Sequence, residues 1–417
     1  MDVVVERCAG LDVHSRQVTA CALWHTAGGR LGEAKAEFAT TAAGLSRLVA
    51  WLREHGVSAV GMEATGVYWM PVYAALEAAE GFDLTLANAH QVKGLPGRKT
   101  DMNDAAWLAR LIRHGLVRKS LVPPKPIREL RDLTRYRRSL VEAQASERRR
   151  LIKLLDAADL KLAAVLSDVF GVSGRAILRA IVEGGHSAAA MAKLARGAAR
   201  RKRPQLIDAL EAEVAPHRRQ LIALQLARVE AAEVDIESLD RQIAAKLEPY
   251  AAQMALLVSI PGIDWVVGAT IIAELGVDMT AFPSAGHAAA WAGVCPGSNQ
   301  SAGKRKPTGA RKGNSHLKTA LCNAAIAATR KRGCGLKAKY HAIKARRGGG
   351  RAAMAIGHKL LILVYHVLAT GQPYREPDAA QQHKRNAERD AKRHVRRLQR
   401  LGFHVTLAPA QEPAHAL

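Results

Sequence analysis

Three prolines within four residues, Pro123, Pro124 and Pro126, divide the chain into parts with different hydrophobic patterns. Proline lacks a backbone N–H donor and disfavours helix in the residue before it, so this run interrupts regular structure. Before it, short apolar runs of strand length alternate with segments of helical spacing. After it, residues 127–250 contain long charged stretches with helical spacing. The pattern predicts an α/β domain followed by a mostly helical remainder.

The first hundred residues predict a β-β-β-α-β-α-β-α order, which is typical of an α/β layer with a mixed sheet. Strands are expected at residues 8–13, 18–24, 57–62 and 84–87, and a further extended segment, third in order, is expected to end near residue 38. Helices are expected at 42–55, 70–79 and 100–114. Gly115 is expected to end the last helix.

Residues 127–252 predict a long helical arm, because apolar residues are sparse and recur at roughly heptad spacing. An antiparallel coiled coil fits this pattern and offers a surface where two subunits meet. Turns are expected at Gly171–Gly185 and Arg196–Pro204.

Residues 253–375 predict a compact, mostly α-helical domain. Ser259–Ile263 separates two apolar helices. It is either a helix-hairpin-helix turn, whose glycine admits phosphate, or an ordinary helix–helix turn. A further apolar helix is expected at 352–368, and the tail at 376–417 is expected to be basic and partly disordered. The expected domains are therefore 1–126, 127–252, 253–375 and 376–417.

Positive charge is concentrated in one part of this chain. The 417 residues hold 62 Lys and Arg against 37 Asp and Glu, a net charge of +25. No Asp or Glu occurs from Met279 to Arg375, which holds 17 Lys and Arg, whereas residues 1–104 hold 12 acids and 9 Lys and Arg. This favours a polyanionic partner over a small-molecule substrate, with a generic basic surface as the alternative. Aromatic residues are only 4%, which argues against an RNA platform of stacked rings.

The five cysteines form no C-x-x-C pair, which excludes a zinc ribbon, and their sparse, odd number suits a reducing compartment. The first ten residues carry acids and lack a long apolar run, and Leu360–Leu368 is too short to span a bilayer. The sequence therefore predicts a cytoplasmic protein with no membrane partner.

Four carboxylates form a candidate metal site. Asp12 lies in the first strand, Glu63 ends a later strand, and Asp101 and Asp104 share one face of a helix's first turn. Gathered together, they would repel one another unless divalent cations bind, and hard oxygen ligands suit Mg²⁺. Taken singly, Asp101 and Asp104 could be ordinary first-turn acids and Glu63 a surface strand end. The full set has the layout of ribonuclease-H-like nucleases.

A serine lies in a glycine-rich loop that is followed by six basic residues. The loop does not match a Walker A motif, because five residues separate Gly297 from Gly303 and Arg305 stands where Ser or Thr is required. The cations would attract a phosphate and stabilise charge in its transition state, or the segment is simply a polar turn on a basic patch. The six basic residues are Lys304, Arg305, Lys306, Arg311, Lys312 and Lys318.

Three motifs of the N-terminal part, Gly10–His14, Glu63–Tyr68 and Lys99–Ala105, together resemble those of the DEDD-type transposases of IS110 insertion sequences. The resemblance implies an N-terminal domain similar to the RuvC nuclease. It also implies that Asp12, Glu63, Asp101 and Asp104 are the metal ligands.

The C-terminal part resembles the transposase domain of the same family. Its matching motifs are Pro261-Gly262, Ala292–Pro296, Ser301–Lys304 and Arg311–Asn314, with Ala302 where the family has glycine. The family's nucleophilic serine maps to Ser301, and Ser298 is its competitor in the same loop.

The resemblance implies a nucleoid-associated transposase that recombines double-stranded DNA at element ends and targets. It implies two Mg²⁺ ions per site, with Mn²⁺ as a substitute, a phosphoserine intermediate, guidance by a noncoding bridge RNA, and a dimer or tetramer. Two alternatives remain: a hydrolytic RuvC-like nuclease for branched DNA, which needs no serine, and a binding protein with degenerate acids.

Overall fold

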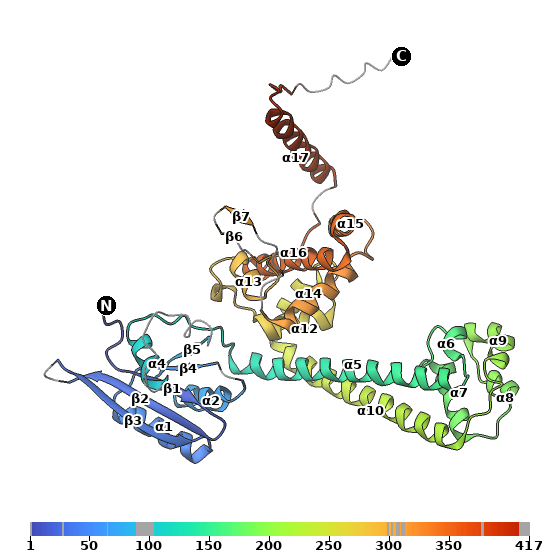
Figure 1. The fold of residues 1–417 in the computed structure, drawn as a ribbon, viewed down its shortest axis with the longest axis horizontal. Coiled ribbons are helices and arrows are strands. Elements are labelled where there is room, and N and C mark those ends of the chain that lie inside the picture. The colour runs from blue at the N-terminus through green and yellow to red at the C-terminus, as the bar shows by residue number, and fades with distance from the viewer. Residues whose placement is uncertain are drawn as a thin grey trace. The chain divides into compact units, whose positions relative to one another are not determined.

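The computed structural model describes residues 2–26, 29–64, 66–88, 104–297, 300–301, 303–305, 309, 313–376 and 379–407. The chain forms two compact units, Met1–Pro123 and Pro124–Leu417, which Figure 1 shows in the colours of the sequence. The boundary coincides with the proline run.

The N-terminal unit is built on one mixed sheet of five strands in the order β3-β2-β1-β4-β5. β2 pairs antiparallel with β1 and β3, while β4 is parallel to both β1 and β5. The strands are β1 Cys8–Val13, β2 Gln17–His25, β3 Leu31–Ala39, β4 Ala59–Glu63 and β5 Asp83–Ala87.

Helices cover both faces of this sheet. Leucines of α1 (Ala42–Glu54) and apolar residues of α2 (Trp69–Ala79) pack with Leu11 and Met62 on one face. Apolar residues of α4 (Asp104–Arg113) pack with Cys8 and Leu23 on the other. The predicted element order is confirmed, and the sheet with its helices is consistent with a ribonuclease-H-like α/β domain.

Burial under α4 also determines the ionisation state of two cysteine thiols. It raises the pKa of Cys8 to about 11 and that of Cys21 to about 11. Neither thiol is ionised at neutral pH, so both act as small core residues.

The second unit starts with two long helices, α5 (Lys125–Ala157, 33 residues) and α10 (Pro216–Leu247, 32 residues), which pack against each other. They are antiparallel, since Glu129 of α5 pairs with Lys246 while Arg148 pairs with Glu233. In α5, no residue between Thr134 and Leu151 is buried.

Ion pairs join the two helices along this stretch, with Arg137–Asp240 at 2.5 Å and Arg148–Glu233 at 2.7 Å. The predicted coiled coil is therefore not confirmed, because a coiled coil needs a continuous apolar seam.

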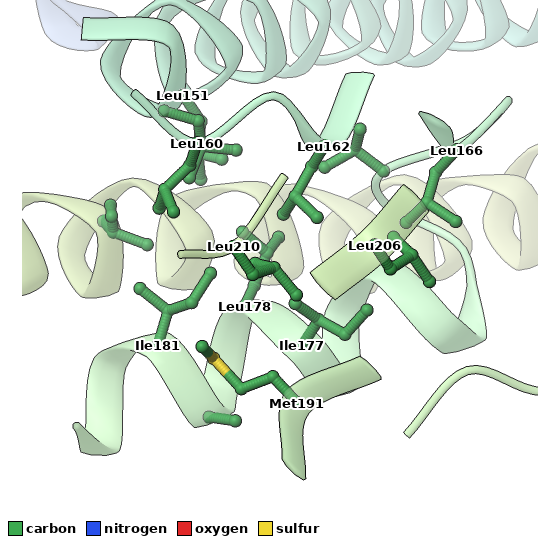
Figure 2. Close-up of a cluster of buried hydrophobic side chains, with 14 of the residues drawn as sticks. Leu151, Leu160, Leu162, Leu166, Ile177, Leu178, Ile181, Met191, Leu206 and Leu210 are labelled. Atoms are coloured by element: carbon green, nitrogen blue, oxygen red, sulfur yellow. The ribbon is translucent and has the colours of Figure 1, made fainter. Parts of the chain in front are cut away.

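A separate hydrophobic core closes the far end of these two helices, as Figure 2 shows. Leu151 and Leu155 of α5 pack there with Ile177, Leu178 and other residues of the intervening segment. That segment contains α6 Leu162–Val165, α7 Val172–Glu183, α8 Ala188–Lys193, the 3₁₀ helix η1 Gly197–Lys202 and α9 Arg203–Asp208.

The two turns predicted in this segment are wrong, because α7 spans most of the first and η1 with the start of α9 most of the second. Apolar residues at helical spacing, Ile177, Leu178 and Ile181, are buried and stabilise α7 despite its flanking glycines.

The C-terminal half of this unit is organised around α16 (Gly349–Thr370). By length and composition α16 could cross a membrane, but 44% of its apolar window is buried and it packs against α11, α13, α14 and α15. The surrounding elements are η2 Glu248–Tyr250, α11 Ala251–Val258, α12 Trp265–Leu275, η3 Met279–Ala281, α13 Ala285–Trp291, α14 Ser315–Ala328 and α15 Gly335–Arg347. The tail contains a helix, α17 Ala379–Arg400.

Gly262, in the turn between α11 and α12, has a positive φ of 89°, and a Cβ there would lie 2.2 Å from the backbone oxygen of Ala324. The glycine is thus required by close packing against α14. This role corresponds to an ordinary helix–helix turn.

Two sheet glycines bring α4 close to the sheet and generate a stability prediction. A Cβ at Gly10 would lie 2.1 Å from Ala105 O, whereas a Cβ at Gly61 would first meet side-chain atoms of Ile112, at 2.6 Å. We expect Gly10→Ala to cost about 1–3 kcal/mol, because backbone must move, and Gly61→Ala to cost less, because a side chain can rotate. Calorimetry of the full chain would measure both, and equal melting temperatures would contradict the prediction.

Candidate functional site

Asp12 and Glu63 lie at equivalent positions on neighbouring parallel strands. Leu11 of β1 pairs with Met62 of β4, and each acid is the next residue along its strand. The side chain of Asp12 is 32% exposed, and Glu63 is also partly buried. The two carboxylates therefore occur together at the carboxyl end of these strands.

Both acids belong to the sheet face that α4 covers. Side chains alternate between faces along a strand, so Asp12 shares its face with Gly10, and Glu63 shares its face with Gly61. Gly10 approaches the backbone of α4, and Gly61 approaches Ile112 of the same helix.

Asp104 begins α4 at the end of the helix that points toward Asp12. The Cys8 thiol donates to Ala109 O at 3.4 Å, and Gly10, two residues further along β1, packs on the earlier residue Ala105. The helix therefore runs opposite to β1, and its first residue lies toward the strand's carboxyl end. Asp101 lies outside the described residues.

The site is open and polar. His14 Nε2 is 3.1 Å from Asp12 Oδ2, and the His14 side chain is 65% exposed. Among the described residues, no group of three or more His, Cys, Asp or Glu is close enough to hold a metal. The carboxylate oxygens at this edge are nevertheless donors of the kind that a hard divalent cation prefers.

The loop that contains Ser301, between Gly293 and Gly313, is called the serine loop, and it contains a short β-hairpin. Strand β6 is Gln300–Ser301, strand β7 is Lys304–Arg305, and Ser301 pairs with Lys304 across a turn in which Gly303 has φ of 76°.

For Ser301, Lys304 and Arg305 the structure describes the backbone, and Lys318 lies in the first turns of α14. Ser298, Lys306, Arg311 and Lys312 are outside the described residues.

The two ends of the serine loop are in direct contact. A Cβ at Gly313 would lie 2.5 Å from Gly293 N, so only glycine allows these two backbone segments to meet. Cys295 Sγ, in the first of these segments, lies 3.7 Å from His358 Nδ1 of α16. The loop is therefore anchored at its base by backbone contact and by α16.

A buried carboxylate joins this loop base to α5. Glu274, near the end of α12, is completely buried. Arg135 of α5 donates to both of its oxygens, at 2.7 and 2.8 Å, and Asn314 Nδ2 donates at 2.6 Å. Asn314 also caps α14 by accepting from Leu317 N at 3.0 Å. Arg131 adds a charge at 3.4 Å and donates to two backbone oxygens of α12.

These contacts fix the charge state of the cluster. Burial by itself would raise the pKa of Glu274, but hydrogen bonds from Arg135 and Asn314 and the charges of Arg135 and Arg131 hold this pKa below its ordinary value. The hydrogen bond with Glu274 raises the pKa of Arg135. Burial lowers the pKa of neighbouring His316, and the charge of Arg135 lowers it further.

This cluster was not predicted from the sequence, although one signal for it exists. Glu274 is the only charged residue in the apolar helix Trp265–Leu275, and a lone acid in such a run implies a buried partner. The partner could not be identified, since Arg135 is 139 residues away in a stretch full of arginines.

Two family models match the chain. Residues 9–158 match a model described as transposase, of the DEDD type of IS110 elements. Residues 254–341 match a model described as transposase of the IS116/IS110/IS902 family. The chain belongs to the IS110 family of transposases. Among curated proteins no match was found.

The two matches contain the two candidate sites of this transposase. The first includes Asp12, Glu63 and Asp104, and the second includes Glu274 and Ser301. Family membership identifies the protein as an enzyme that processes DNA and therefore binds it. Enzymes of the DEDD type use divalent metal ions, which agrees with the oxygen donors at the sheet edge.

The Glu274 cluster predicts a large loss of stability on neutralisation. Glu274→Gln keeps the side-chain volume but leaves Arg135 and Arg131 without their counter-charge, so we expect a loss of about 3–5 kcal/mol. Glu237→Gln is the matched control, because Glu237 pairs with Arg241 on the surface, and it should cost less than about 1 kcal/mol. Urea denaturation of both variants measures the difference, and similar costs would refute the argument.

The same cluster predicts acid sensitivity. Because the pKa of Glu274 is lower in the folded than in the unfolded chain, its ionisation stabilises the fold above the ordinary carboxyl range. That stability is lost as pH falls through this range to the lower folded pKa. Glu274→Gln should remove this component, so the stability difference from wild type should shrink on acidification, as denaturation at several pH values would show.

Proposed function

We propose that this transposase cuts and rejoins DNA strands with Ser301 as nucleophile and with Mg²⁺ held by Asp12, Glu63, Asp101 and Asp104. The observation that carries the proposal is that Asp12 and Glu63 lie at the carboxyl ends of neighbouring strands, at the sheet edge toward which α4 begins with Asp104. The family models place these acids and Ser301 within matched regions.

The acids have a defined task in this proposal. Asp12 and Glu63 hold cations from adjacent strands, and Asp104, with Asp101 before it, from the start of α4. Two Mg²⁺ ions held there, for which Mn²⁺ can substitute, would supply charge neutralisation at the scissile phosphate. Without such cations, carboxylates gathered at one site would repel each other and DNA alike.

Ser301 supplies the covalent step. Its Oγ forms a bond to the scissile phosphorus, the bond from phosphorus to the 3′ oxygen breaks, and the serine proton ends on the released 3′ hydroxyl. Reversal of this exchange with a different 3′ hydroxyl reseals the DNA and regenerates the serine. The phosphoserine link conserves the energy of the phosphodiester, so no nucleotide cofactor is needed.

The basic residues near the serine, Lys304, Arg305, Lys306, Arg311, Lys312 and Lys318, bind phosphates of double-stranded DNA at element ends and targets. A noncoding bridge RNA supplies sequence recognition by base pairing. The chain's net charge of +25 and its 4% aromatic content support backbone binding without direct base reading.

The acid-free segment from Met279 to Arg375 supports a composite site. Because the acids belong to the first unit and Ser301 to the second, with the long helical arm between them in sequence, the acids of one subunit act with the serine of another in a dimer or tetramer. The enzyme acts in the cytoplasm, at the nucleoid.

The serine step is tested on a denaturing gel with purified protein, Mg²⁺, labelled element-end DNA and RNA from the element's flanks. We expect a DNA band covalently linked to protein, lost in Ser301→Ala and kept in the matched variant Ser298→Ala. Cleaved DNA without attached protein, unaffected by Ser301→Ala, would instead identify a hydrolytic nuclease for branched DNA. Binding without cleavage in the wild type would identify a binding protein with degenerate acids.

The composite site is tested by mixing variants. Ser301→Ala subunits and Asp12→Ala subunits are each expected to be inactive alone, whereas their mixture should recover a fraction of the cleavage because each lacks a different half of the site. Absence of recovery, with both variants folded and oligomeric, would place acids and serine in one subunit.

A further inference from the structure

The far end of the arm carries basic side chains that the transposase domains do not account for. From Lys193 to Arg203 there are six Lys and Arg in eleven residues, and no Asp or Glu occurs between Glu183 and Asp208. Five of the six are exposed, and four of these five, Lys193, Arg196, Arg200 and Arg201, have side chains that make no hydrogen bond or ion pair among the described residues. We call these four residues the arm-tip cluster.

The fold holds this cluster on a firm base. η1 lies between α8 and α9, whose Met191 and Leu206 are buried in the core shown in Figure 2. Ser173 Oγ accepts from Arg196 N at 2.9 Å, and Lys202 and Arg203 donate to backbone oxygens of Val165 and Lys193. Two of the six cations thus serve the fold, and the other four face outward.

The cluster differs from the cations that join α5 to α10 in its lack of counter-charges. Along α5 and α10, Arg137, Arg148 and Lys246 are each paired with an acid. Among the described residues, the side chains of the arm-tip cluster donate no hydrogen bond and form no ion pair. Unpaired cations at this density repel one another, and a bound polyanion would relieve this repulsion.

The side chains at the arm tip favour the phosphate backbone of a nucleic-acid duplex as the polyanionic partner. Phe170 is the only aromatic residue between 151 and 229, and it is buried. Unstacked bases are recognised by exposed aromatic rings, which this surface lacks, so it suits phosphates alone. A duplex offers them as a regular row.

The length of the arm sets where on a duplex this contact falls. Arg135 is fixed to the base of the serine loop through Glu274, and Leu155 is buried in the hydrophobic core at the arm tip that Figure 2 shows. Twenty residues of helix between them span about 30 Å. One turn of B-form DNA rises about 34 Å, so the tip reaches phosphates roughly one turn from those at the serine loop.

We propose that the arm-tip cluster is a second DNA-binding surface, which contacts the backbone of double-stranded DNA about one helical turn from the serine loop. The contact is independent of sequence and of catalysis. It lengthens the DNA that one subunit holds and orients that DNA along the arm.

The test compares two double variants that remove equal charge. Arg200→Ala/Arg201→Ala changes the tip, and Arg149→Ala/Lys153→Ala changes exposed cations of α5 that have no partner among the described residues. Affinity for a labelled 40-base-pair duplex is measured by fluorescence anisotropy at several salt concentrations. EDTA is present, so the result does not depend on metal or on Ser301.

We expect the tip variant to bind more weakly at low salt and to lower the slope of log affinity against log salt by about 1.8, which is about 0.9 for each lost phosphate contact. The control should keep the wild-type slope, and Arg200→Lys/Arg201→Lys should restore it because the charge returns. Unchanged slopes, or equal changes in the tip variant and the control, would overturn the proposal. A loss confined to a structured RNA, with duplex DNA unaffected, would overturn it as well. Equal melting temperatures establish that each variant is folded.

Discussion

The carboxylate of Glu274 is the constraint on which the second unit depends. Moving a charge into a protein interior costs several kcal/mol unless hydrogen-bonded partners replace its water. Here the partners are Arg135 and Arg131 of α5 and Asn314 at the start of α14. Since these residues are far apart in sequence, the charge is satisfied only when α5, α12 and α14 are assembled together. Assembly of the arm's base and of the serine loop's base is therefore one event.

Close backbone contacts complete this positioning in both units, and glycine makes each of them possible. Gly10 lets α4 approach β1, which brings Asp104 toward the strand end that carries Asp12. Gly313 lets the end of the serine loop meet its beginning at Gly293. Asp12 lies two residues beyond the Gly10 contact, so a small backbone displacement there would move its carboxylate directly.

Prediction from sequence succeeded where the signal is local. A short apolar run of strand length predicted β1 as Cys8–Val13, and the other strands differ from expectation by a few residues, because strand signals depend on near neighbours. The alignment of Asp12 with Glu63 depends on strand pairing, which sequence spacing does not contain. The arm shows the opposite failure: sparse heptad-like leucines suggested an apolar seam, whereas ion pairs with partners about a hundred residues away join its middle.

The same ion pairs determine how charge is distributed over the second unit. Acids of α10 pair with Arg137 and Arg148 in the middle of the arm, whereas positive charge is densest at the arm tip and in the acid-free segment from Met279 to Arg375. The arm separates these two regions by about 30 Å. The Debye length at physiological salt is about 8 Å, so neither region influences a phosphate bound at the other. A short anion gains from one region alone, and only an extended, continuously charged partner gains from both. In the proposed binding mode, this arrangement favours long nucleic acid by geometry, without any contact to a base.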